Sequence, residues 1–306
     1  MSGNAAKRRA AQTLMVDAAT AEVIGALTLR AVDCILLRGP AVARRLYDAV
    51  ELRSYIDADL LVSPHQMIEA EGALSAIGFA PLADDGDLNR HRPVHAREWQ
   101  RGMVSVDLHR RVAGCTAPDD VTWQTFHEHS AVVNLAGASA RIPSPAALAL
   151  IVALHAAHNG PRMPKPLADL ARALERFDDA TWDEASQLAE RAGATPAFAA
   201  GLRLLPAGAA RAPRVVPTID VALRSSGAPP LSLGIDWLLR TRGLREKAAL
   251  VKHVVLPPSG ALRTWRPLAR RGRAGLIAAY VSHPFWLIGH TIPSLRALVR
   301  ARQQHS

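Results

Sequence analysis

A six-residue segment, Asp57 to Val62, constrains the fold of this chain more than any other. Its sequence is DADLLV, so two aspartates separated by one residue lead directly into three apolar residues. A short apolar run of this kind predicts a buried strand. Because alternate side chains of a strand point to the same face, Asp57 and Asp59 would emerge side by side. Two carboxylates this close repel each other and need a cation, a shared proton or full solvation.

Helical and strand-like patterns alternate through the first half of the chain. Apolar spacing over residues 12–31 predicts one helix or a pair of short helices, and VDCILL (Val32 to Leu37) predicts a buried strand. After the strand at Asp57, Ser63-Pro64 predicts the start of a helix over residues 65–77. Further strands are expected over residues 91–99 and 103–109, then in AVVNLAG with ARIPS as a possible hairpin arm. This alternation indicates an α/β (α+β) layered fold.

From Ser144-Pro145 onward the patterns are helical, with no convincing strand. The stretch between Pro206 and Pro230 is rich in Gly, Pro, Ala and Arg, which favours a loop or linker. We therefore expect four segments: a core over residues 1–143, a helical domain over 144–205, a linker over 206–230 and a basic helical region over 231–306.

The net charge of +10 is unevenly distributed. From Gly201 onward there are 17 Lys and Arg against three acids, whereas the first 200 residues carry 20 against 24. A basic surface of this kind suits nucleic acid, anionic lipid or a phosphorylated substrate, although a solvated Arg-rich surface is an equal alternative.

Cysteine usage bears on the cellular compartment. The chain has only Cys34 and Cys115, with no C-x-x-C spacing, and its first residues lack the apolar core of a secretory signal. This favours a reducing, cytoplasmic location and argues against a thiol-rich zinc site.

A third aspartate extends the acidic pair. Asp107 lies in VSVDLH, a strand-like run. If this strand pairs beside the strand of Asp57 and Asp59, the three carboxylates converge within about one strand spacing, ~5 Å. Such a cluster favours Mg²⁺ or Mn²⁺, and the natural chemistry is phosphoryl or nucleotidyl transfer. A solvated D-x-D or a turn cap is the alternative for the pair alone.

The segment LLRGP lies about twenty residues upstream of the pair. Gly39, placed between a strand and a helix, would let the backbone approach a phosphate closely. Arg38 would add a bidentate contact to the phosphate.

This order of elements resembles the polymerase-beta-type nucleotidyltransferase superfamily. More narrowly, LLRGP, DADLLV, VDLH and LHAAHNG followed by LADLARAL resemble a bacterial group of largely uncharacterised nucleotidyltransferases. The resemblance implies a mixed sheet flanked by helices and followed by a mainly helical C-terminal domain. It also implies that Asp57, Asp59 and Asp107 hold the metal ions, that Asp107 helps to deprotonate the acceptor hydroxyl, and that Gly39 approaches the triphosphate of an NTP.

Two positions depart from the pattern of that group. Arg38 stands where its members usually have Lys, and Pro40 stands where the wider superfamily prefers Gly or Ser. Arginine still binds phosphate, but Pro40 removes one backbone amide.

Several further residues have more than one possible role. Arg53 would contact the triphosphate or Asp57, or would form a salt bridge that orders the loop. His109, on the strand face of Asp107, would orient that carboxylate or the substrate, or would be a structural histidine with its hydrogen bonds satisfied. Lys165 and Asp169, four residues apart, would form an exposed ion pair, unless Lys165 reaches a phosphate. The i, i+3 pair His155 and His158 has metal-binding spacing, but alone it supplies only two ligands for zinc.

The predicted function is metal-dependent transfer of a nucleoside monophosphate from an NTP to a hydroxyl of an unidentified acceptor, with release of pyrophosphate. The acceptor could be a small molecule, a peptide or a protein, and the basic final third makes tRNA modification an alternative. A catalytically inactive nucleotide- or partner-binding module of the same fold is another alternative.

Residues 274–295 carry no charged side chain, yet His and Pro residues interrupt them. We therefore expect a buried or membrane-surface helix there, not a spanning one.

Overall fold

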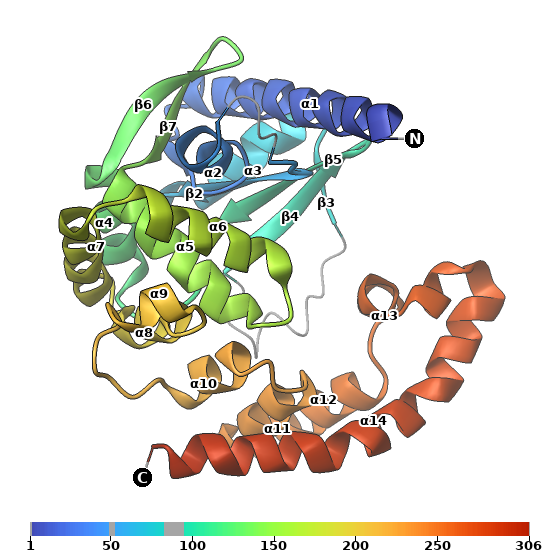
Figure 1. The fold of residues 1–306 in the computed structure, drawn as a ribbon. Helices are drawn as coiled ribbons and strands as arrows, with labels where there is room; N and C mark the ends of the chain where they lie inside the picture. Colours follow the sequence, from blue (N-terminus) through green and yellow to red (C-terminus); the bar gives the residue numbers. More distant parts are fainter. Residues whose placement is uncertain (1, 49–52, 83–94, 306) are drawn as a thin grey trace. The chain divides into compact units, whose positions relative to one another are not determined.

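The computed structural model describes residues 2–48, 53–82 and 95–305, which form two compact units (Figure 1). One comprises the described residues of Met1–Leu82 and His95–Val215, and the other those of Val216–Ser306. The units divide at Val215, inside the segment for which composition predicts a linker. Two short helices, α9 (Pro206–Ala209) and α10 (Ile219–Ser225), lie in that segment.

A mixed five-stranded sheet organises the first unit, with strand order β1-β2-β5-β4-β3. The β2 and β5 strands pair in parallel, and the other neighbours are antiparallel. The strands are β1 (Cys34–Leu36), β2 (Asp57–Val62), β3 (Ala80–Pro81), β4 (Ala96–Arg101) and β5 (Val104–His109). This confirms the α/β class and the pairing of the DADLLV and VSVDLH strands.

One face of the sheet forms the apolar core. The side chains that alternate with the aspartates, such as Ala58, Leu60, Val106 and Leu108, are fully buried against two helices. These helices are α1 (Ser2–Thr28) and α3 (Met67–Ala76), which follows the 3₁₀ turn η1 (Pro64–Gln66). Because side chains alternate along a strand, the aspartates project from the opposite face.

In Figure 1, α5, α6, α7 and α8 lie on the other side of the sheet from α1 and α3. Among them, α5 begins at the predicted Ser144-Pro145 signal, where the Ser144 hydroxyl accepts a hydrogen bond from the Ala147 amide. Eleven of its residues are buried, so α5 is enclosed on nearly all sides. It packs on α8 so closely that a Cβ at Gly201 would lie 2.0 Å from the Ala153 carbonyl oxygen. Besides α1, α3 and α9, the helices of this unit are α2 (Pro40–Leu46), α4 (Asp119–Glu128), α5 (Pro145–Asn159), α6 (Pro164–Arg176), α7 (Asp179–Arg191) and α8 (Thr195–Leu202).

Most of the predicted elements occur, with shifted bounds. The first helix is a single one that starts earlier than expected, and AVVNLAG with ARIPS forms the hairpin β6 (Ser130–Leu135) and β7 (Ala138–Pro143). Residues 91–94 of the strand predicted over 91–99 lie outside the described residues, and β4 begins at Ala96. The sequence patterns gave no indication of β3 or α4.

The second unit is helical in its described part. A 32-residue helix, α14 (Gly272–Gln303), packs on α10, α11 and η2. Buried Asp236 on α11 pairs with Arg240 and Arg302. None of the described helices combines the length and apolar character needed to cross a bilayer. The other elements are α11 (Leu231–Arg240), α12 (Leu244–Val255), α13 (Ser259–Trp265) and η2 (Pro267–Arg270).

Candidate active site

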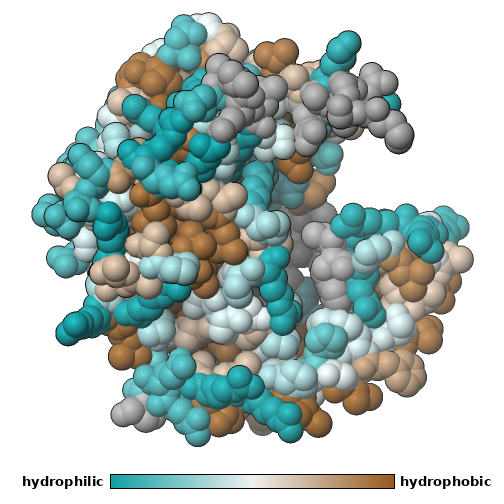
Figure 2. Space-filling view, in the orientation of Figure 1, coloured by the Kyte–Doolittle hydropathy of each residue, from teal (hydrophilic) through white to brown (hydrophobic). Residues whose placement is uncertain are grey.

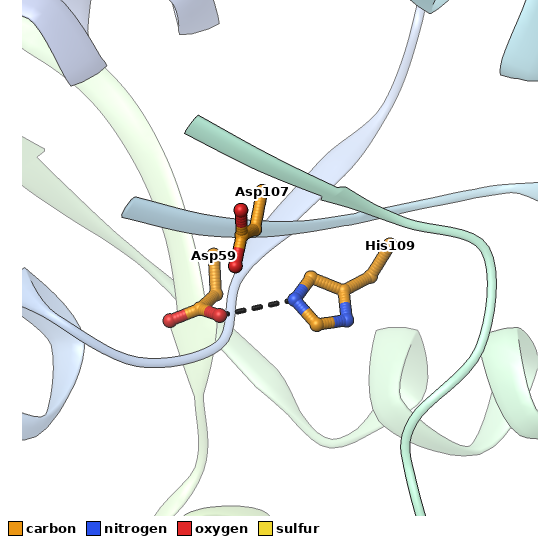
Figure 3. Close-up of side chains that lie close together, drawn as sticks. All are labelled: Asp59, Asp107 and His109. Carbon is orange, nitrogen blue, oxygen red and sulfur yellow. Dashed lines mark hydrogen bonds and ion pairs between the residues drawn. The ribbon is translucent and has the colours of Figure 1, made fainter. Parts of the chain in front are cut away.

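The carboxylates of Asp59 and Asp107 lie side by side because β2 and β5 pair with these two residues directly opposite. His109, two residues further along β5, shares their face. Ligand atoms of all three residues lie within 4.8 Å of one another. Figure 3 shows the His109 ring directed at Asp59, with Asp107 beside them. Two of the three predicted carboxylates therefore meet, together with a histidine.

Asp57 lies next to this group but is not part of it. It pairs with Ser105, one step along the same face as Asp59. Burial, followed by the negative charge of Asp59, raises the pKa of Asp57. The carboxylate of Asp57 thus lies in the electric field of the group and adds to its negative charge.

Two side chains donate hydrogen bonds to the carboxylate of Asp59. Arg38 Nη2 and His109 Nε2 both contact its Oδ1 atom, the latter at 3.0 Å. Oδ2 makes no hydrogen bond to any described residue. Burial opposes ionisation, but Arg38 and His109 outweigh it and hold the pKa of Asp59 well below its usual range. Since an ionised carboxylate only accepts hydrogen bonds, Nε2 of His109 carries the proton. Its buried Nδ1 has no partner among the described residues.

Asp107 carries the opposite perturbation. Burial, followed by the charge of Asp59, raises its pKa to about 6, with smaller contributions from Asp57 and Glu98, while His109 opposes the shift. The cluster thus holds more negative charge than its cations balance. A set of closely spaced carboxylate oxygens under mutual repulsion fits a hard divalent cation such as Mg²⁺ or Mn²⁺.

Arg38 connects the carboxylates to α5. Its Nη1 contacts the ring of His155, while its Nη2 contacts Asp59. Burial, followed by the Arg38 charge, lowers the pKa of His155 well below its ordinary value, so the ring is neutral and can accept this hydrogen bond. Asn159 Nδ2 lies 3.2 Å from the same ring. The side chain of Arg38 remains 22% exposed, so part of it faces solvent.

Gly39 is placed where no other residue fits without strain. Its φ is +60°, and a Cβ there would lie 2.7 Å from the backbone oxygen of Asp57. The turn between β1 and α2 therefore rests directly on the strand that carries the aspartates.

We expect Gly39→Ala to displace either the turn or Asp57, because the added methyl group meets backbone and the φ is unfavourable. The substitution should lower the free energy of unfolding by about 1–3 kcal/mol. Chemical denaturation measures this loss. As a control, Gly102→Ala has the same φ of +60° but no atom within 4 Å of the new Cβ. Equal losses in the two variants would show that the contact with Asp57 has no energetic effect.

Arg53 forms a buried, bidentate ion pair with Asp169. Its Nε and Nη2 lie 2.7 and 2.6 Å from the two carboxylate oxygens, and its Nη1 donates to the Gly39 carbonyl at 3.2 Å. Tyr47 donates to the same carboxylate at 2.8 Å. The side chains of Arg53 and Asp169 are only 7% and 3% exposed. This ion pair ties the turn at Gly39 to α6.

This pair corrects the expectation of an exposed ion pair between Lys165 and Asp169. Asp169 is buried and faces Arg53, because the planar guanidinium fork satisfies both carboxylate oxygens. Lys165 lies near the carboxylates instead. Partial burial and the Arg53 charge lower its pKa, against the effect of Asp57, Asp169 and Asp59.

A row of histidines borders the cluster. The ring centroids of His95 and His109 are 6.0 Å apart, and those of His95 and His158 are 5.4 Å apart. His155 and His158 do not belong to any group of three potential metal ligands among the described residues. The two α5 histidines therefore lie beside the carboxylates without forming a separate zinc site with described residues.

Sequence reasoning missed three residues of this site: His95, Glu98 and Tyr47. Glu98 pairs with Asp107 across β4 and β5, and its charge acts on that residue. The alternation in AREWQR, where Trp99 is buried, would have placed Glu98 on the face of the aspartates. His95 lies within the strand expected over residues 91–99, but no motif singles out His95 or Tyr47 as a site residue.

A cavity of about 540 Å³ lies beyond the C-terminal ends of β2 and β5, lined by His65, Arg110, Arg111 and Cys115 among others. None of the three aspartates lines it, and Asp119 already pairs with both arginines. Burial raises the pKa of the Cys115 thiol to about 12. The cavity is separate from the carboxylate cluster.

A family model described as "uncharacterised nucleotidyltransferase" matches residues 4–207. The match covers most of the first unit, including every residue of the carboxylate cluster. None of the curated proteins compared with the chain matches it significantly.

Three solved structures are similar to parts of this chain at low sequence identity and low TM-score. The crystal structure of ANT(2'')-Ia in complex with adenylyl-2''-tobramycin is 13% identical, with a TM-score of 0.40, over 57% of this chain and 97% of that one. The solution structure of the same antibiotic-resistance factor is 15% identical, with a TM-score of 0.38, over 56% and 90%. An antigenic nucleotidyltransferase-like protein from Paracoccidioides brasiliensis is 13% identical, with a TM-score of 0.35, over 61% and 91%.

Proposed function

The chain belongs to the family of uncharacterised nucleotidyltransferases, and on that premise we propose that it transfers a nucleoside monophosphate from an NTP to a hydroxyl of an acceptor. The observation that carries the proposal is the register of β2 and β5, which sets Asp59 opposite Asp107. Closely spaced carboxylates of this kind can hold the divalent cations that nucleotidyl transfer uses, which supports the proposal.

The reaction has a simple balance. The acceptor oxygen forms a bond to the α-phosphorus, the bond from that phosphorus to the β-phosphate oxygen breaks, and pyrophosphate leaves. Asp107, which lies directly opposite Asp59 on the paired strands, accepts the proton of the acceptor hydroxyl. The products are the nucleotidylated acceptor and pyrophosphate.

The metal site would use Oδ2 of Asp59 with the carboxylates of Asp57 and Asp107. His109 donates to Oδ1 of Asp59, so it orients this carboxylate and leaves Oδ2 available. When bound, Mg²⁺ or Mn²⁺ would neutralise the phosphate oxygens and make the acceptor hydroxyl more acidic.

The nucleotide phosphates would be bound by Arg38 and Lys165, with the backbone at Gly39 approaching them. Both side chains lie close to the carboxylates, and Arg38 is partly exposed. Arg53 is committed to Asp169, so we assign it the positioning of the Gly39 turn. Because Pro40 begins α2 and has no amide hydrogen, side-chain cations would carry more of the phosphate binding than they do where Gly or Ser stands.

A metal-dependent thermal shift tests the site without knowledge of the acceptor. Mn²⁺ with a non-hydrolysable ATP or GTP analogue, at about 100 times Kd, should raise the Tm of the first unit by roughly 5–10 °C. Asp107→Asn should abolish this shift, whereas Asp179→Asn, on a side chain that is 80% exposed, should keep it. A shift of equal size in the Asp107→Asn protein would remove Asp107 from the site.

Catalysis is tested with α-labelled NTPs, Mg²⁺ or Mn²⁺, and pools of small molecules, peptides and tRNA as acceptors. Label transferred to an acceptor, with matching pyrophosphate release, supports the enzyme. Tight binding of the nucleotide without any turnover over all pools would instead indicate the inactive module.

A further inference from the structure

The helix α14 carries a continuous apolar stripe that the second unit leaves exposed. Its side chains are between 43% and 72% exposed. They recur every three or four residues, so at 3.6 residues per turn they fall within an arc of about 80°. Figure 2 shows brown, hydrophobic side chains along the edge of the second unit where α14 runs. The stripe consists of Ile277, Val281, Phe285, Ile288, Ile292, Leu295 and Val299.

The stripe is not the face by which α14 packs in its own unit. That face lies on the other side of the helix axis and contacts α10, α11 and η2. Its buried residues are Gly275, Ala279, His283, Ser294, Leu298 and Ala301. The unit therefore satisfies one side of α14 and leaves seven large apolar side chains on the other. Soluble surfaces rarely expose contiguous apolar patches of this size without an occupant.

The charged residues of α14 indicate which kind of partner the stripe binds. The α14 helix contains four arginines and no acidic residue. Arg273 and Arg296 fall within about 40° of the edges of the stripe. An apolar stripe bordered by cations matches an interface whose surface is anionic and whose interior is hydrocarbon.

The same charges disfavour a second copy of the chain. In a parallel or an antiparallel helix pair, the arginine-bearing ends of one α14 would lie against those of the other. No acidic residue of the helix is available to pair with them. Helix pairs of this kind are normally stabilised by opposite charges beside the apolar seam.

We propose that the exposed face of α14, from Ile277 to Val299, binds in the plane of an anionic membrane surface. The helix lies along the lipid headgroups, with the stripe in the acyl boundary and Arg273 and Arg296 beside the phosphates. This proposal rests on the second unit alone and does not depend on the nucleotidyltransferase chemistry.

Vesicle sedimentation of the full-length protein tests the proposal. The protein should sediment with vesicles of phosphatidylcholine and phosphatidylserine, and much less with phosphatidylcholine alone. Ile288→Glu should weaken binding at least about tenfold, since it removes an apolar side chain that would insert into the lipid and adds a charge that anionic headgroups repel. Arg273→Glu with Arg296→Glu should also weaken it, and high salt should do the same.

Ile68→Glu is the matched control, because Ile68 is an isoleucine of α3 that is 82% exposed and lies in the first unit. Circular dichroism confirms that each variant is folded. Binding that Ile288→Glu and Ile68→Glu reduce equally would overturn the proposal, as would equal sedimentation with neutral and anionic vesicles. A dimer in analytical ultracentrifugation that Ile288→Glu dissociates, without vesicle binding by wild type, would assign the stripe to a second copy instead.

Discussion

Asp59→Asn is expected to lower the rate of nucleotidyl transfer by roughly 1,000-fold or more. The substitution keeps the shape of the side chain and its acceptor oxygen for His109, but it removes the charge that a divalent cation requires. Asp59 is also the residue on which Arg38 and His109 converge. Pyrophosphate release under saturating NTP and Mn²⁺ measures the effect.

Two controls separate chemistry from folding in this experiment. Asp179→Asn changes an exposed aspartate of the same unit and should retain full activity. The far-ultraviolet spectrum of the Asp59→Asn protein should match wild type, because the sheet is stabilised by its other, apolar face. Full activity in a folded Asp59→Asn protein would refute the assignment of this site.

Arg53→Met is expected to cost about 3–5 kcal/mol of folding free energy. Among the described residues, the Tyr47 hydroxyl is then the one donor left to the buried Asp169 carboxylate. For a unit of this size the loss corresponds to a fall in Tm of roughly 6–20 °C. Thermal unfolding followed by circular dichroism measures it.

The double variant Arg53→Met with Asp169→Leu should recover most of the loss, since no charge remains buried without a partner. Arg191→Met, which removes an exposed pair with Glu128, should leave the Tm almost unchanged. If the double variant is no more stable than Arg53→Met alone, the penalty comes from lost packing and not from an unpaired charge.

Local sequence patterns were sufficient to predict the strands of the site. In DADLLV and VSVDLH, apolar residues alternate with or follow the aspartates, and burial of that apolar face determines which way the acids point. The pairing of the two strands then follows from the layered architecture. For this reason the contact of Asp59 with Asp107 was accessible from sequence.

The partner of Arg53 was not accessible in the same way. Asp169 lies 116 residues further along the chain, and its local neighbour Lys165 is at ideal helical spacing for an ion pair. In the fold, the bidentate geometry of arginine and the burial of Asp169 prevail over that local preference. Glu98 and His95 were missed for a related reason, since their roles depend on which strand and helix lie beside them.

The enclosure of α5 has a practical consequence for shortening the chain. A fragment cut at residue 143 would leave the sheet without the helix that bears His155, and would strip Arg53 of its carboxylate on α6. In the C-terminal fragment, the buried side chains of α5 that face the sheet would be exposed to water. Neither fragment should therefore be recoverable in native form from bacteria. A truncated expression clone that retains the carboxylates of Asp57, Asp59 and Asp107 should therefore extend to about Val215, where the first unit ends.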